Sequence, residues 1–138
     1  MEWDTDAATA AIVERMRAVY ETGDLAQIEA AALEYATDDT VDEFPQSGEV
    51  FKGRAALEAL TADYATATGT RPSLALREIR GRGDLWIIES TVDYGNGQTA
   101  SVVTIVELEN GKTRRQTDYF AAPFEAPEWR RPFRVAPA

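Results

Sequence analysis

The chain has 138 residues, of which 44% are hydrophobic and 28% charged, so it is long and apolar enough for one domain with a single core. Its formal net charge of −10 repels phosphate backbones and anionic membrane surfaces, which argues against nucleic acid and membranes as partners. The sequence contains no cysteine and no histidine, so disulfides, thiolate chemistry and histidine-based catalysis are excluded. Any catalysis must use carboxylates, tyrosines, hydroxyls, lysines or arginines, and no cofactor or metal is expected.

The N-terminal residues carry no recognisable targeting signal. Residues 1–6 are acidic and lack the basic and apolar regions of a signal peptide. No apolar run approaches the ~20 residues of a membrane span. We therefore expect a cytoplasmic protein, with residues 1–138 forming a single domain.

Helical periodicity dominates the first half of the chain. Asp4, Thr5 and Asp6 offer N-caps for a first helix, whose apolar positions are Ala8, Ile12, Met16, Val19 and Tyr20. Gly23 ends this helix, and Asp24 with Gln27 three residues later resembles a capping box that starts a second one. A break at Thr37-Asp38-Asp39 ends the second helix, and an extended segment from Thr40 stops at Pro45. A third helix is expected between Gly53 and Gly69.

From Ser73 onward the apolar period changes from helical to alternating. Four strands are predicted, over residues 74–80, 85–94, 99–108 and 113–120, and glycine-bearing turns separate them. The Asn110-Gly111 pair is a strong hairpin signal. Short turns imply an antiparallel meander, and helices followed by strands indicate an α+β domain with the helices on one face of a curved sheet. The proline-spaced tail, residues 122–138, is expected to lie extended over the domain, closing a cavity or contacting a second subunit.

Several short motifs follow one another in a recognisable order. They are Gly23-Asp24-Leu25, the run from Tyr35 to Val41 before Pro45, Gly48, Gly53-Arg54, and Gly111-Lys112 before Asp118-Tyr119-Phe120. This order resembles a SnoaL-like domain of the nuclear transport factor 2-like superfamily. The resemblance implies a cone-like α+β fold, in which three N-terminal helices pack on a strongly curved, mainly antiparallel sheet around a cavity. Relatives include ketosteroid isomerase, scytalone dehydratase, limonene epoxide hydrolase, polyketide cyclases, and non-catalytic modules.

The resemblance also implies which residues could be catalytic. The isomerase positions fall on Met16, Phe44 and Thr104, none of which can perform that chemistry, and the dehydratase mechanism needs histidines. The epoxide-hydrolase pattern transfers better, with carboxylates at Asp93 and Asp118, Thr91 in place of an arginine, and polar positions at Val41 and Glu43. Asp118 is then the expected principal acid/base, and Asp93 and Glu43 assist it.

Strand alternation leaves the orientation of the second predicted strand open. One face carries Glu89, Thr91 and Asp93, and the other carries Trp86, Ile88, Ser90 and Val92. The resemblance implies that the Glu89 face lines the cavity. The apolar character of the opposite face favours the reverse arrangement, and parity alone does not decide between them.

Further groups could contact a substrate in such a cavity. Gln116 shares a strand face with Asp118, and Tyr20 and Tyr35 could supply hydroxyls that orient a substrate, although tyrosines on a helix stripe are usually core residues. Carboxyl groups that converge in an apolar cavity cannot all ionise, so at least one of their pKa values would rise. An acid beside a carboxylate is the pairing that acid/base catalysis needs.

The sequence therefore favours a cofactor-independent acid/base enzyme of the cyclase, isomerase, dehydratase or epoxide-hydrolase type, acting on a small organic molecule. The alternative is a non-catalytic ligand-binding or dimerisation module of the same fold. The resemblance also implies a homodimer formed through the outer sheet face, for which Val103, Ile105, Trp86 and Ile88 could supply an apolar patch.

Overall fold

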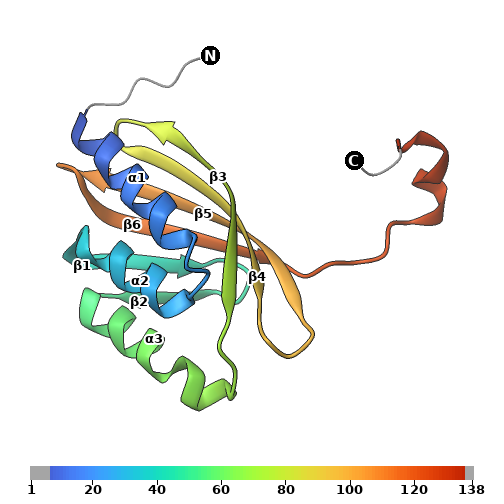
Figure 1. Cartoon of the computed structure of the whole chain (residues 1–138), viewed down its shortest axis with the longest axis horizontal. Helices are drawn as coiled ribbons and strands as arrows, with labels where there is room; N and C mark the ends of the chain where they lie inside the picture. The colour runs from blue at the N-terminus through green and yellow to red at the C-terminus, as the bar shows by residue number, and fades with distance from the viewer. Residues whose placement is uncertain (1–6, 136–138) are drawn as a thin grey trace.

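Three helices pack against one six-stranded sheet in the computed structural model, which describes residues 7–135 (Figure 1). The helices are α1 (Ala7–Tyr20), α2 (Leu25–Glu34) and α3 (Arg54–Thr68). The Asp24 side chain caps α2 by accepting a hydrogen bond from the Ala26 amide at 3.0 Å. Gln27 donates to the Asp24 carboxylate rather than to its backbone, so the motif is half of a capping box. The proposed caps Asp4, Thr5 and Asp6 lie outside the described residues.

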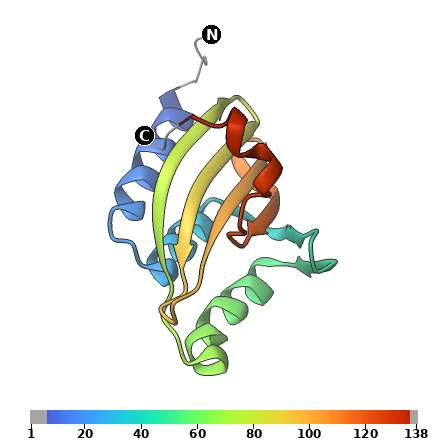
Figure 2. The same cartoon turned by 90° about the vertical axis from the view of Figure 1, so that its right-hand side faces the viewer.

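The strands run in the order β2-β1-β6-β5-β4-β3 across the sheet. Their bounds are β1 (Ala36–Phe44), β2 (Glu49–Lys52), β3 (Ser73–Arg82), β4 (Leu85–Asp93), β5 (Thr99–Glu109) and β6 (Lys112–Ala121). The predicted antiparallel meander from β3 to β6 is confirmed. The sheet curves around the helices without closing, as Figure 2 shows for β3, β4 and β5, so the expected α+β cone is confirmed.

The parallel pairing of β1 with β6 was not predicted, and it makes the sheet mixed. β1 also begins at Ala36, so the prediction that an extended segment starts only at Thr40 is wrong. The reason is tertiary: the Thr113 amide donates to the Tyr35 carbonyl at 2.8 Å, and Ala36 pairs with Thr113. The contact with β6 therefore keeps this polar stretch in an extended conformation, although aspartate is uncommon in strands.

The core lies between the helices and the concave face of the sheet. Its main cluster joins α1 and α2 to β3 and β4 and consists of Met16, Tyr20, Ile28, Ala31, Ile79, Trp86 and Ile88. Trp86 and Ile88 are each 8% exposed, so the prediction that they belong to an outer dimerisation patch is wrong. Alternation along β4 turns Leu85 and Ile87 outward instead, and these two side chains are 45% and 38% exposed.

Gly81 allows the close approach of β3 and β4 at their hairpin. Its φ is +153°, and a β-carbon at this position would lie 2.2 Å from the Leu85 carbonyl oxygen. Gly83, two residues further along, also has a positive φ of +59° but has open space around it. Only Gly81 is therefore required both by backbone conformation and by packing.

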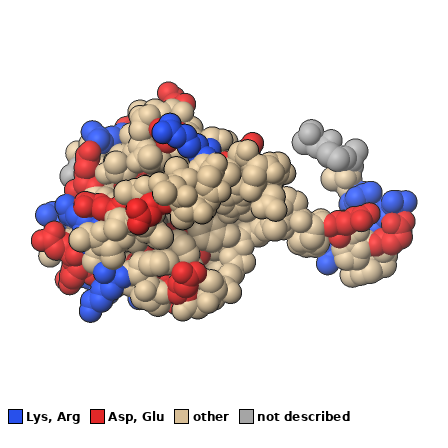
Figure 3. All heavy atoms as spheres, turned by 90° about the horizontal axis from the view of Figure 1, so that it is seen from below, with Lys and Arg blue, Asp and Glu red and all other residues tan. Residues whose placement is uncertain are grey.

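The C-terminal tail does not lie over the domain. It leaves the sheet after Ala121, runs outward and ends in the short 3-10 helix η1 (Glu128–Phe133), which Figure 3 shows as a separate lobe on a narrow neck. The large apolar side chains Phe124, Trp129, Phe133 and Val135 are 71–88% exposed. The expectation that the tail covers the domain is thus wrong, because Pro123 and Pro127 favour an extended path away from it.

Candidate active site

Polar side chains from three strands meet on the concave face of the sheet. The register places Asp42 of β1 opposite Gln116 of β6, and Asp118 of β6 opposite Thr104 of β5. Residues two apart on a strand share a face, so Gln116 and Asp118 project toward the same interior. The parallel β1–β6 pair thereby brings two aspartates together from opposite halves of the chain.

Asp118 is buried, with 7% of its surface exposed, and two side chains donate hydrogen bonds to it. The Thr104 hydroxyl donates to Oδ1 at 2.5 Å, and the Gln116 amide donates to Oδ2 at 2.9 Å. Each carboxylate oxygen thus has one fixed donor. Such contacts orient the group and favour an acceptor role for it.

Asp42 is equally buried, with 6% exposed, but it is not satisfied in the same way. Its Oδ1 has no hydrogen-bond partner among the described residues. Burial raises the pKa of Asp42 far above the ordinary value of a carboxyl group, and the hydrogen bond to Asp118 and the negative charges of Asp118 and Glu29 raise it further. Burial beside a second carboxyl group therefore favours the protonated form of Asp42.

Glu29 of α2 supplies a third carboxyl group. Burial, followed by the charge of Asp118, raises the pKa of Glu29 to about 7. The residue as a whole is partly exposed, because it also borders an outer groove, but its carboxyl group is directed inward. Within residues 7–135, none of the ion pairs involves Glu29, Asp42 or Asp118.

Tyr20, at the end of α1, borders the same cluster and is 7% exposed. Burial raises the pKa of its phenol, the charges of Glu29 and Asp118 raise it further, and the neighbouring Ser90 hydroxyl offsets a small part of this. Tyr20 therefore stays a neutral hydroxyl that can donate a hydrogen bond.

Two adjoining cavities lie beside these groups. The larger has a volume of about 70 Å³ and mainly apolar walls, which include Ile12, Met16, Tyr35, Trp86 and Ile88. The smaller, of about 10 Å³, is bordered by Glu29, Thr40 and Asp42. Ala32, Thr113 and Gln116 line both cavities. An apolar ligand in the larger cavity would thus lie next to the acidic groups.

A groove of about 420 Å³ between α2 and α3 opens on the other side of Glu29. Glu29 borders both this groove and the smaller cavity. The carboxyl group of Glu29 therefore separates the acidic interior from the outer surface.

Comparison with known proteins identifies the family. The model of the SnoaL-like domain matches residues 13–116, which is most of the chain and includes α2, β1 and Asp42. The chain belongs to the SnoaL-like domain family. A search of curated proteins finds no match to the sequence.

Solved structures agree with this assignment of the SnoaL-like domain. An NTF-2 like protein of unknown function from Burkholderia xenovorans LB400 is 32% identical, with a TM-score of 0.76 over 96% of this chain and 100% of that one. A candidate ketosteroid isomerase from Kribbella flavida DSM 17836 is 20% identical, with a TM-score of 0.75 over 95% and 91% of the two chains. A candidate SnoaL-like polyketide cyclase from Jannaschia sp. CCS1 is 17% identical, with a TM-score of 0.65 over 86% and 91%. The last two similarities concern the fold alone.

Four of the predicted site residues lie at the interior of this SnoaL-like domain. Asp118 and Tyr20 belong to the acidic cluster, and Gln116 and Tyr35 line the larger cavity. Their catalytic or binding roles remain predictions. Glu43, by contrast, faces the convex side of the sheet, where it forms an ion pair with Arg115. β1 alternation directs Asp42, not Glu43, inward.

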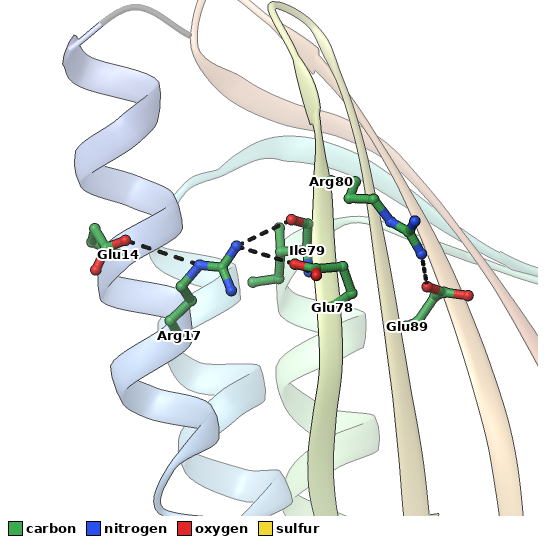
Figure 4. A network of polar contacts seen from close by, with 6 residues as sticks. All are labelled: Glu14, Arg17, Glu78, Ile79, Arg80 and Glu89. Atoms are coloured by element: carbon green, nitrogen blue, oxygen red, sulfur yellow. Dashed lines mark hydrogen bonds and ion pairs between the residues drawn. The ribbon is translucent and has the colours of Figure 1, made fainter. Parts of the chain in front are cut away.

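The three predicted residues on β4 also lie on the convex face. Glu89 forms an ion pair with Arg80, and Figure 4 shows this pair on the far side of β3 from α1 and Arg17. Thr91 is exposed, and the Asp93 carboxylate accepts a hydrogen bond from the Gly95 amide at 2.9 Å. The orientation implied by the resemblance is thus corrected, because Trp86, Ile88, Ser90 and Val92 fill the interior. The structure does not bring Glu43, Asp93 and Asp118 together.

Sequence reasoning missed Asp42, Glu29 and Thr104. Glu29 lies four residues after Leu25 and three before Ala32, so it falls within the apolar stripe of α2. A charged residue at such a position is a local signal that could have identified Glu29. Asp42 lies on the same strand face as Thr40 and Phe44. The Phe44 ring contacts the rings of Phe51 and Phe120, with centroid separations of 5.0 and 5.1 Å. Those aromatic contacts favour the inward orientation of this face of β1, and the contact with Phe120 joins residues too far apart in sequence for a local pattern to show it.

Metal-binding clusters and membrane-spanning helices are both absent from the described part of the chain. No group of three or more histidine, cysteine, aspartate or glutamate side chains there could hold a metal ion. No helix there is long and apolar enough to cross a membrane.

Proposed function

We propose that this SnoaL-like domain is a cofactor-independent acid/base enzyme for a small, mainly apolar, uncharged organic molecule. The observation that carries the proposal is the buried pair of carboxyl groups, in which Asp42 has an oxygen without a hydrogen-bond partner among the described residues and lies beside the doubly hydrogen-bonded Asp118. An acid and a base held next to an apolar cavity can transfer protons without any other group.

The roles of the two aspartates follow from their contacts. Asp118 accepts a proton from the substrate, because Thr104 and Gln116 hold its oxygens in the acceptor orientation. Asp42 donates its proton to the oxygen on which negative charge develops, and Tyr20 can donate a second hydrogen bond there. In an isomerisation, the proton on Asp118 returns at another carbon and Asp42 regains its proton from the enol oxygen. In an elimination of water the Asp42 proton leaves with the hydroxyl group, and in a cyclisation it stays on the product oxygen; transfer of the proton from Asp118 to Asp42 then restores the starting state. Acid/base assistance of this kind contributes roughly 10²–10⁴ in rate.

The uncharged character of the substrate follows from the lining. The larger cavity contains mainly apolar side chains, and among residues 7–135 no arginine or lysine pairs with the three carboxyl groups. An anionic substrate would meet apolar walls there and the like charge of the carboxyl groups beside the cavity. Its volume of about 70 Å³ further limits the occupant to a small molecule or to one end of a larger one.

Deuterium exchange tests the proposal with simple model compounds in place of the natural substrate. Small ketones, 3-oxo esters and unsaturated ketones are incubated with the protein in D₂O, and deuterium incorporation next to the carbonyl is followed by NMR. The wild-type protein should accelerate exchange for at least one compound. Asp118→Asn should lower that rate by a factor of about 100 or more, and Asp42→Asn by a factor of about 10 or more.

Glu43→Gln and Asp93→Asn are matched controls, because both carboxylates lie on the convex face. They should leave exchange unchanged. Exchange that survives intact in a folded Asp118→Asn protein would refute the proposed role of Asp118.

A second candidate function is ligand binding without turnover. The observation that favours it is the larger cavity itself, whose walls are mainly apolar and lack the three carboxyl groups. Isothermal titration with the same compounds separates the two candidates. Tight binding that is unaffected by Asp42→Asn and Asp118→Asn, without any exchange, would support the binding module.

A further inference from the structure

Glu29 lies between the acidic interior and the surface of the molecule. Its helix α2 packs between α1 and α3 (Figure 1). The Glu29 side chain borders the smaller interior cavity on one side and the groove between α2 and α3 on the other. Leu33 also borders both spaces, but its side chain has no atom that exchanges protons. Among the described residues that line these two spaces, Glu29 is thus the one titratable group common to both.

The smaller cavity has the size and the lining of a site for one water molecule. Its volume of about 10 Å³ is near the ~10–15 Å³ that one water molecule needs. Besides Glu29, the polar residues that line it are Thr40, Asp42, Thr113 and Gln116. Asp42 is 6% exposed, and its Oδ1 has no hydrogen-bond partner among the described residues. A buried polar atom of this kind needs a partner, and a water molecule bound in the cavity would supply it.

Asp42 connects this cavity to the proposed base of the reaction. A hydrogen bond joins the carboxyl groups of Asp42 and Asp118. A carboxyl group can accept a proton on one oxygen and donate one from the other. Asp118, Asp42 and Glu29 therefore form a series of proton-carrying groups that begins in the interior and ends at the outer groove.

We propose that Glu29 relays protons between the two buried aspartates and water in the groove between α2 and α3, through one water molecule in the smaller cavity. This relay rests on the proposed acid/base function and supplies the route by which that site exchanges protons with solvent. A proton that Asp118 has taken from the substrate passes to Asp42, then through the cavity water to Glu29, and finally to water in the groove. Each transfer breaks one O–H bond and forms the next. A solvent proton returns by the same route, so the charges of the three carboxyl groups are restored.

The surroundings of Glu29 favour a group that alternates between two protonation states. Burial, followed by the charge of Asp118, raises its pKa to about 7. The groove carries charges of both signs, from Asp24, Glu58 and Arg71. Within residues 7–135, none of the ion pairs holds the Glu29 carboxylate in its charged form. A carboxyl group with a pKa near the ambient pH takes up and releases a proton with similar ease.

Solvent deuterium in the product of an unsaturated ketone measures this route. In D₂O, absorbance follows the shift of the double bond into conjugation, and mass spectrometry gives the deuterium content of the product early in the reaction. Glu29→Gln should lower the deuterium content per turnover about tenfold, because the substrate proton returns to the product before it exchanges. A merely structural role of Glu29 would change the rate of conversion and leave the deuterium content per turnover unaltered.

A second variant blocks the outer end of the relay and keeps Glu29 in place. Ala62 is exposed on α3 and lines the groove, so Ala62→Trp should fill the groove and also lower the deuterium content. Should Glu29→Gln unfold the chain, Ala62→Trp alone gives the test. Glu58→Gln and Ala67→Trp are the matched controls, because Glu58 borders the groove but not the smaller cavity, and Ala67 of α3 lines neither. Both controls should leave the deuterium content unchanged.

Infrared spectroscopy tests the relay without any substrate. The protonated carboxyl group of Asp42 gives a carbonyl stretching band that shifts on deuteration, and loss of the band in Asp42→Asn assigns it. After rapid mixing with D₂O, the band should shift about tenfold more slowly in Glu29→Gln than in the wild-type protein. Glu58→Gln should keep the wild-type rate.

An unchanged deuterium content, or an unchanged infrared rate, in a folded Glu29→Gln protein would overturn the relay. An infrared rate that falls equally in Glu58→Gln would overturn it as well, since Glu58 does not reach the smaller cavity. Absence of any conversion by the wild-type protein would instead refute the proposed enzyme, and the infrared rates alone would then decide the relay.

Discussion

Asp42 shows how burial, rather than a cationic neighbour, sets the charge of a side chain. Its carboxyl group is 6% exposed, one of its oxygens has no partner in residues 7–135, and the nearest charges are those of Glu29 and Asp118. An ionised Asp42 would be costly in this setting, so the native chain keeps the proton. The same holds in part for Glu29, whose pKa is raised to about 7.

These protons make stability depend on pH. Because native Asp42 and Glu29 keep protons that the unfolded chain releases, the free energy of unfolding should fall as pH rises above about 4.5. The Glu29 contribution is present below about pH 4.5 and lost by about pH 7, and the Asp42 contribution continues to fall above neutrality. Each retained proton gives a slope of up to about 1.4 kcal/mol per pH unit. Urea unfolding between about pH 5 and 8 measures how the free energy of unfolding changes with pH.

Substitution separates the two contributions. Glu29→Gln should flatten the slope below pH 7, and Asp42→Asn should flatten it over the whole range and make the protein more stable than wild type at alkaline pH. Glu49→Gln, at an exposed position on β2, is the control and should leave the slope unchanged. A wild-type stability that is constant across this range would contradict the raised pKa values.

At the residue scale, sequence reasoning could find Asp118 but not its partner. Asp118 was proposed from a resemblance, and the structure places it inside. Asp42 and Glu43 are adjacent, and a difference of one position sends a side chain to the opposite face of a strand. Phe120, whose ring contacts Phe44 on the Asp42 face, lies on β6 and is distant in sequence, so no local pattern could reveal that contact.

The hairpin between β3 and β4 is an element whose geometry depends on one glycine. Gly81→Ala would place a methyl group 2.2 Å from the Leu85 carbonyl oxygen and strain a φ of +153°, so we expect a loss of roughly 2–4 kcal/mol. Gly83→Ala meets open space and should cost about 1 kcal/mol from its positive φ alone. Chemical denaturation of both variants checks the prediction, and equal losses would show that the close approach does not matter.

At the element scale, the helices and the meander could be predicted because their signals are local. Asn110-Gly111 specifies its hairpin through backbone conformation, with Asn110 at a φ of +52° and Gly111 at +76°. The β1–β6 pairing has no such signal. It joins strands separated along the chain by α3 and four other strands, and parallel pairing leaves no turn between them to recognise.

The whole molecule consists of a compact domain and a tail that stabilises it little by itself. Removal of residues 122–138 should therefore change the melting temperature of the dilute protein very little, since the large apolar side chains of the tail are 71–88% exposed. Scanning calorimetry of the full and the shortened chain measures the difference.

A large loss of stability in the dilute shortened chain would contradict this division into domain and tail. The sequence did indicate a proline-spaced terminal segment, but its direction away from the sheet depends on the path of six residues, which composition alone does not fix.

The position of β6 between β1 and β5 has a consequence for synthesis on the ribosome. Until residues 112–121 emerge, the β1–β2 hairpin and the β3–β5 meander have no shared strand, because β6 is the sole bridge between them in the sheet order. The acidic interior cannot form earlier, since Asp118 arrives with this last strand, long after Asp42 has emerged. Folding of this sheet should thus be a slow event that follows the emergence of residues 112–121, with long-range pairing as its rate-limiting step.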